Sequence, residues 1–153
     1  MNFLRRKLLK MAPFAALAGF AEAKPAAGKG SKTRRVYDPD HKPTSKEIPL
    51  YSPVISYGDT IFVSGHGVNT SSDVRKQTAE VLDYVERSLR TAGSSMAKVL
   101  KVNVYLRHLE DYAAMNEVYR GRFGPEPPVR TTVAVAGIPL EGCLVEIEVI
   151  AGV

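Results

Sequence analysis

The sequence predicts a single α+β domain over residues 48–153, with strands and helices in the order ββαβαββ and both helices on one face of a sheet. Short segments that alternate apolar and polar residues indicate the strands, and two segments with apolar residues at helical spacing indicate the helices. Breaks rich in glycine and proline separate these segments. The composition, 44% hydrophobic and 24% charged, is typical of a globular protein with a packed core.

The domain is predicted to begin with a β-hairpin and an amphipathic helix. Residues 54–57 and 60–64 are rich in β-branched and aromatic side chains, and Gly58-Asp59 between them is typical of a hairpin turn. Ser71-Ser72-Asp73 then offers an N-cap, because apolar residues at helical spacing follow over residues 74–89. This stripe predicts a helix that packs on the sheet.

The middle of the chain continues with a strand and a second helix. Gly93 ends the first helix, as glycine often does just after a C-cap. Residues 95–99 fit one short helical turn, and residues 101–107 alternate as a strand. Helical spacing returns over residues 111–123, which form the second predicted helix.

The chain is predicted to end with two strands. Residues 124–128 include three prolines and stop the second helix, and residues 130–136 and 144–150 alternate as strands around a turn at residues 137–142. Two helices on one face leave the other sheet face uncovered, which is a liability in a small domain. Association of several copies would cover it, so we expect a closed cyclic homo-oligomer.

The positive charge of the chain lies outside the predicted domain. The formal net charge is +5, but residues 1–23 carry +3 and residues 24–50 carry +4, which leaves −2 for residues 51–153. Nucleic-acid binding needs clustered lysine and arginine on the folded surface. The charge distribution therefore argues against a nucleic-acid partner.

Cysteine and histidine offer little for disulfide or metal chemistry. Cys143 is the only cysteine, so no intramolecular disulfide can form. His41, His66 and His108 stand far apart and show no spacing typical of metal ligands. We expect no metal ion.

The N-terminus is predicted to be a signal peptide over residues 1–23. A basic head, an apolar stretch too short to span a membrane, and small residues at Ala21-Glu22-Ala23 support this interpretation. Residues 5–10, RRKLLK, resemble the twin-arginine export motif, with a Sec signal or a retained anchor as alternatives. Residues 24–47 hold few large apolar groups and are predicted to be a flexible basic spacer. The expected location is periplasmic or extracellular, without stable membrane insertion after cleavage.

Two polar positions in the last strands suggest a binding site. Arg130 opens a strand directly after the proline-rich break, with Thr131 and Thr132 beside it. Glu146 and Glu148 share one face of the last strand because strand side chains alternate. These patterns alone indicate an α+β oligomer with an anion site and identify no reaction.

The C-terminal third resembles the signature of a known family. Residues 130–139, RTTVAVAGIP, followed by residues 144–151, LVEIEVIA, are similar to the RidA (YjgF) family pattern. The similarity continues upstream through Tyr51, Ser64-Gly65 and two helical segments, residues 77–93 and residues 111–116. It covers nearly everything from Ile48 onward.

This resemblance implies a chorismate-mutase-like fold that forms a homotrimer with clefts between subunits. Members of the RidA type hydrolyse enamines and imines such as 2-aminoacrylate, which pyridoxal-phosphate enzymes release. The products are 2-keto acids and ammonia, and no cofactor is required. The substrate partner would be a small imine or enamine that carries a carboxylate.

The resemblance assigns the two central roles to Arg130 and Glu146. Arg130 matches the arginine that binds the substrate carboxylate, since a planar guanidinium can donate two parallel hydrogen bonds. Glu146 matches the glutamate that positions or activates water. The alternatives are a surface salt bridge for Arg130 and a solvated strand position for Glu146, the interpretation we give to Glu148.

Five further residues match cleft-lining positions of the family: Tyr51, Ser64, Gly65, Asn116 and Thr132. Tyr51 would cap the pocket, and Gly65 would bring backbone close to the ligand because it lacks a Cβ. Core packing is the alternative role for Tyr51, and a helix-to-loop hydrogen bond is the alternative for Asn116.

The sequence departs from the family pattern in three places. Thr132 stands where many members carry cysteine, so no reactive thiol is expected there, although a backbone role would survive. His66 replaces a common glutamine, and a structural role is the favoured interpretation. The loop at residues 67–72 is shorter than in typical members, which would widen the cleft or shift substrate preference.

Two other functions compete with a deaminase. A non-catalytic binder of small carboxylates would use the same cleft, and export motivates it because reactive enamines arise mainly in the cytoplasm. An older family label suggests an endoribonuclease. The net charge of −2 over residues 51–153 argues against RNA binding.

Overall fold

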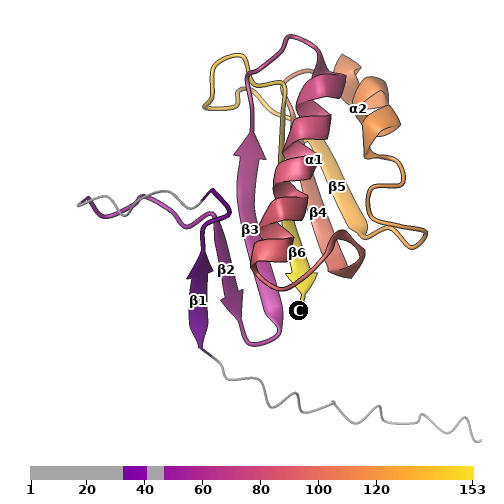
Figure 1. Cartoon of the computed structure of the whole chain (residues 1–153). Coiled ribbons are helices and arrows are strands. Elements are labelled where there is room, and N and C mark those ends of the chain that lie inside the picture. Colours follow the sequence, from indigo (N-terminus) through magenta and orange to yellow (C-terminus); the bar gives the residue numbers. More distant parts are fainter. Residues whose placement is uncertain (1–32, 41–46) are drawn as a thin grey trace, which may run out of the picture.

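The computed structural model describes residues 33–40 and 47–153, which form one mixed sheet with two α-helices (Figure 1). The sheet has six strands in the order β1-β2-β3-β6-β4-β5. The elements are β1 (Arg34–Tyr37), β2 (Val54–Tyr57), β3 (Thr60–Gly67), α1 (Val74–Thr91), β4 (Val99–Leu106), α2 (Tyr112–Tyr119), β5 (Val129–Ala134) and β6 (Val145–Gly152). Short 3-10 turns at Met96–Lys98 and Leu109–Asp111 precede β4 and α2. The predicted order ββαβαββ is confirmed from β2 to β6.

The last strand of the chain lies in the middle of the sheet. β6 pairs antiparallel with β3 on one side and with β4 on the other, whereas β5 pairs parallel with β4. Both helices cover the same face, with α1 packed on β3 and β6 and α2 packed against α1 (Figure 1). The predicted α+β architecture with two helices on one face is confirmed.

α1 begins and ends where the sequence predicts. The carboxylate of Asp73 accepts a hydrogen bond from the backbone N–H of Arg75 at 2.9 Å, which satisfies one free donor of the first turn. Gly93 has a φ of +85°, and the N–H of Ser94 donates to the carbonyl of Leu89 at 2.8 Å, which closes the last turn. The predicted apolar stripe is buried against the sheet.

The predicted flexible spacer over residues 24–47 is wrong at Arg34–Tyr37, which form strand β1. β1 pairs antiparallel with β2, so backbone groups at this edge gain partners that our count of apolar side chains ignored. Tyr37 also packs against the core, and its hydroxyl lies 3.3 Å from that of Ser56. The predicted signal peptide and residues 24–32 and 41–46 of the spacer lie outside the described residues.

The sheet face opposite the helices, which we call the open face, carries apolar and polar side chains together. Its apolar residues include Val36, Phe62 and Val133, which are 52%, 39% and 43% exposed. This composition agrees with the predicted need for cover by other copies of the chain. Over residues 33–40 and 47–153, no helix is long and apolar enough to cross a membrane.

Candidate functional site

Arg130 lies on the helix-covered face of the sheet, near the start of β5. Its strand neighbour across the parallel pair is Val102, which is fully buried under the helices. The guanidinium carbon lies 4.5 Å from the centre of the Tyr119 ring, and Nη2 donates to the Tyr112 hydroxyl at 3.3 Å. No carboxylate within residues 33–40 and 47–153 forms a salt bridge with Arg130. The salt-bridge alternative is therefore wrong for the part of the chain that the structure describes.

Arg130 lines a cavity of ≈ 610 Å³ between the loop after α2 and the start of β5. Asn116 from α2 lines the same cavity, together with apolar walls from three prolines. Thr132 lies two residues further on the same face of β5, and its buried hydroxyl has no hydrogen-bond partner among the described residues. We call Asn116, Arg130 and Thr132 the arginine half-site.

The positive charge of Arg130 is not neutralised by its aromatic neighbours. Burial raises the pKa of Tyr119 to about 12, with the charge of Arg130 acting in the opposite direction. Tyr119 is therefore neutral at physiological pH and offers Arg130 a ring face instead of a counter-ion. A small anion that enters the cavity would meet an uncompensated guanidinium.

Tyr112→Phe is expected to weaken binding of a small monocarboxylate such as propionate by about 2- to 10-fold, because one hydrogen bond contributes about 0.5–1.5 kcal/mol. The substitution removes the hydroxyl that orients Arg130 and keeps the ring. Isothermal calorimetry on the purified protein would measure the change. Tyr57→Phe, an exposed tyrosine on β2, is the matched control and should leave the affinity unchanged. Equal or tighter binding by Tyr112→Phe would contradict the role of this hydroxyl.

Glu146 lies on the open face, close to the start of β6. A side-chain carbon at Gly65 would collide with Oε1 of Glu146 and lie 3.0 Å from its Cδ, so the carboxylate rests where Gly65 has no Cβ. Burial raises the pKa of the half-buried Glu146 carboxyl, and the nearby charge of Glu148 raises it further. Glu146, Glu148 and Tyr105 line one cavity of ≈ 190 Å³. We call Gly65 and Glu146 the glutamate half-site.

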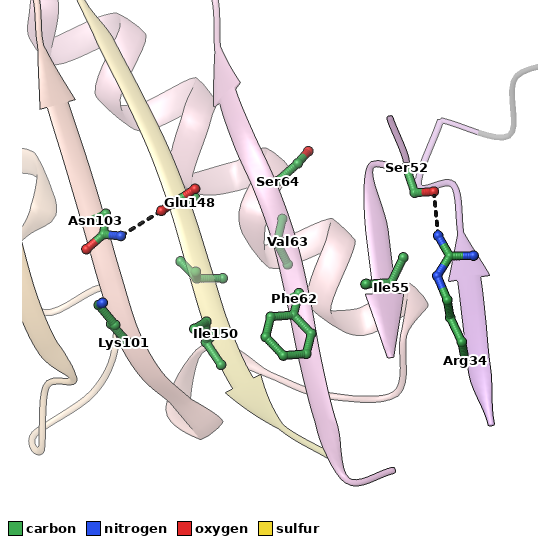
Figure 2. A pocket seen from close by; sticks show the side chains of 11 residues that line it. Arg34, Ser52, Ile55, Phe62, Val63, Ser64, Lys101, Asn103, Glu148 and Ile150 are labelled. Atoms are coloured by element: carbon green, nitrogen blue, oxygen red, sulfur yellow. Dashed lines mark hydrogen bonds between the residues drawn. The ribbon is translucent and has the colours of Figure 1, made fainter. Parts of the chain in front are cut away.

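The interpretation of Glu148 as a solvated strand residue is wrong. Its Oε1 accepts a hydrogen bond from Asn103 Nδ2 at 2.6 Å (Figure 2). It accepts another from the Tyr105 hydroxyl at 3.0 Å, and both donors lie on the neighbouring strand β4. Sequence reasoning did not select the two donors, Asn103 and Tyr105. The signal was available, because the alternation that buries Val102 and Val104 turns Asn103 and Tyr105 toward the open face.

The remaining predicted residues lie in three separate surroundings. Ser64 lines a cavity of ≈ 360 Å³ on the open face, where Figure 2 shows it on β3, across β6 from Asn103. Tyr51 precedes β2 and is 67% exposed, so core packing is the wrong role for it. The ring of His66 stacks on that of Tyr84 from α1 at 3.4 Å between centroids, which agrees with a structural role.

One protomer cannot bring the two half-sites to the same small molecule. Arg130 shares its face with buried Val102, under the helices. Glu146 pairs with Tyr105, whose side chain lies on the open face. The sheet itself separates the guanidinium from the carboxylate, so the two groups do not face a common cavity within one protomer.

Fold and half-sites together define the class: a small α+β protein with an arginine beside a cavity on one sheet face and a half-buried glutamate on the other. The family model described as Endoribonuclease L-PSP matches residues 43–153. The chain therefore belongs to this family, which is also known as YjgF or RidA, and the resemblance found in the sequence is confirmed.

Individual relatives agree with this assignment. A RutC family protein of Pyrococcus abyssi is 40% identical over 113 residues, which cover 69% of this chain and 88% of that protein. A protein of Dermatophagoides farinae named 2-iminobutanoate/2-iminopropanoate deaminase is 31% identical over 108 residues, which cover 66% of this chain and 84% of that protein. The crystal structure of yeast Mmf1 has a TM-score of 0.71 and 27% identity, covering 78% of this chain and 98% of that one.

Proposed function

We propose that this protein is a cofactor-independent deaminase that hydrolyses enamines and imines of the 2-aminoacrylate type to 2-keto acids and ammonia. The observation that carries the proposal is the unpaired guanidinium of Arg130, which faces a cavity beside Asn116. The name of the Dermatophagoides farinae relative supports the same chemistry at the level of the family. Glu146, whose pKa is raised by burial, supplies a carboxylate that can accept a proton from water.

The proposed active site is shared between protomers of a homotrimer. Arg130 and Glu146 lie on opposite faces of the sheet, and the open face exposes apolar side chains that contact with another protomer would bury. A cyclic trimer would place the arginine half-site of one protomer beside the glutamate half-site of the next and repeat that contact at each interface. Tyr51, Ser64 and Gly65 would then line the cleft from the glutamate side.

The proposed reaction proceeds by addition and elimination of water. The substrate carboxylate accepts two parallel hydrogen bonds from Arg130, which fixes its carbon skeleton. The enamine tautomerises to the imine, and Glu146 accepts a proton from water as the oxygen attacks the C=N carbon. Glu146 returns this proton to the nitrogen to give the carbinolamine. It then transfers the hydroxyl proton to the nitrogen as the C–N bond breaks, which releases ammonia and the 2-keto acid.

A coupled assay tests this function directly. An amino-acid oxidase generates imino acids from several amino acids, and the rate of keto-acid and ammonia formation is compared with and without the protein. We expect faster hydrolysis of at least one imino acid at catalytic protein concentration. An unchanged rate for every imino acid would rule out the deaminase.

A non-catalytic carboxylate binder is the second candidate, because binding needs only the arginine half-site, which is complete in one protomer. Under this function, small carboxylates would raise the melting temperature while no imino acid is hydrolysed faster. The coupled assay and a thermal-shift titration on the same preparation distinguish the two candidates.

We also propose that the chain is exported, on the basis of the signal-peptide pattern at residues 1–23. Fractionation of cells that produce the full chain, with N-terminal sequencing of the product, tests this. A cytoplasmic product that retains Met1 would contradict the proposal.

A further inference from the structure

The open face holds two glutamates that differ in their surroundings although they lie two residues apart on β6. Glu148 Oε1 accepts two hydrogen bonds, from Asn103 at 2.6 Å and from Tyr105 at 3.0 Å. Glu146 has no such donor among the described residues and rests in the space left by Gly65. Hydrogen bonds to a carboxylate favour its ionised form. The two carboxylates of the pair therefore differ in support, because two donors hold Glu148 and none of the described residues donates to Glu146.

Few other titratable groups face Glu146. β3 contributes only the two glycines Gly65 and Gly67 beside it. β4 contributes the hydroxyl of Tyr105, whose pKa is raised by burial and by its bond to Glu148. The Cys143 thiol, whose pKa is raised by burial, also feels the charge of Glu146. The guanidinium of Arg107, which follows β4, lies against Gly137, a wall residue of the cavity that Glu146 and Glu148 share. Glu148 is the charged group that raises the pKa of Glu146.

We propose that Glu148, held by Asn103 and Tyr105, is a positioning residue for Glu146. Its fixed negative charge on the shared cavity makes Glu146 the carboxyl that takes and returns the proton. This inference rests on the proposed function and assigns the acid–base role within the pair. Two carboxyls whose environments differ in this way commonly divide into one that exchanges protons and one that stays ionised.

The structure also explains how Glu148 would act without contacting substrate. Both of its hydrogen bonds end on the same oxygen, Oε1, and both donors come from β4, which flanks β6. These bonds fix the Glu148 carboxylate in one position on the wall of the cavity that Glu146 shares. Burial raises the pKa of Glu146, and the charge of Glu148 raises it further, which agrees with this arrangement.

The test is Glu148→Gln, because an amide oxygen can still accept from Asn103 and Tyr105 while the charge is lost. Removing a nearby negative charge lowers the pKa of Glu146, so we expect the acid limb of the pH profile of kcat/KM to move down by about 0.5–1 pH unit. Binding of propionate should be unchanged, because Arg130 lies on the other sheet face. Glu110→Gln, an exposed carboxylate in the turn before α2, is the matched control and should leave the limb in place.

A readout that needs no catalysis separates this inference from the proposed function. Carbon-13 NMR of the glutamate carboxyls, assigned by Glu146→Gln, gives the titration midpoint of Glu146 in the wild-type protein and in Glu148→Gln. A lower midpoint together with a lower acid limb supports the positioning role. An unchanged midpoint overturns it, and so does a lower midpoint with an unmoved limb. Absence of any hydrolysis by the wild-type protein would instead reject the proposed function.

Discussion

Arg130→Ala is expected to lower kcat/KM for imine hydrolysis on the order of 100- to 1,000-fold, because truncating one partner of a charge-assisted pair costs about 2–5 kcal/mol. Arg130 lines the cavity with Asn116 and a second cation, Arg120, and forms no salt bridge with a carboxylate of residues 33–40 or 47–153. Steady-state kinetics with oxidase-generated imino acids would measure the loss. Calorimetry with propionate should show a parallel loss of binding.

Arg130→Lys separates charge from geometry. Lysine keeps the positive charge but cannot donate two parallel hydrogen bonds, so we expect a loss smaller than that of Arg130→Ala yet still about 10-fold or more. Light scattering should show the same assembly for both variants and for the wild-type protein. Wild-type turnover by Arg130→Ala would remove the basis of the deaminase assignment. A change in assembly would instead show that Arg130 holds the subunits together.

The strands and helices could be predicted because their signals are local. The N-cap at Asp73 and the stop at Gly93 each depend on a few neighbouring residues, and the structure confirms both. Strand β1 could not be predicted in this way. Its stability comes from pairing with β2, far along the chain, and from the contact of Tyr37 with the core. A count of apolar residues within one segment does not include such long-range pairing.

The site could be predicted only in part, for a related reason. Alternation along β6 places Glu146 and Glu148 on one face, and this required no knowledge of the fold. The face of Arg130 depends on how β5 aligns with β4, and the sequence does not specify that register. The bonds from Asn103 and Tyr105 to Glu148 likewise exist only because β4 and β6 are neighbours. Residue types were therefore predictable, whereas their relative positions were not.

Glu146→Gln is expected to lower kcat by about 100- to 10,000-fold, the range for loss of a general base. Glutamine has the same shape, so it fits beside Gly65, and propionate binding at Arg130 should remain intact. Lost turnover with retained propionate binding would place the defect in the chemical step and not in substrate binding. Retention of wild-type kcat would show that another group activates water.

Unfolding of Glu146→Gln would not explain the expected loss of kcat. The pKa of Glu146 is raised in the folded protein, so the folded state binds the proton more tightly than the unfolded chain. The stabilising contribution is full at low pH and is lost as pH rises through the folded-state pKa. The wild-type protein loses this contribution as pH rises, whereas the neutral amide of Glu146→Gln does not titrate. At pH 7 the variant should therefore be at least as stable as the wild-type protein. Urea unfolding at fixed protein concentration, at pH 4 and pH 7, would compare the two.

Mixing the two inactive variants decides whether the site is shared. In a trimer assembled at random from equal amounts of Arg130→Ala and Glu146→Gln protomers, about one interface in four pairs an intact Arg130 with an intact Glu146 of the partner subunit. Unfolding and refolding the mixture together should therefore recover about a quarter of the wild-type activity, while each variant refolded alone stays inactive. Because Arg130 and Glu146 lie on opposite faces of one sheet, recovery is the expected result. A mixture as inactive as its components would mean that the two residues do not serve one site across an interface.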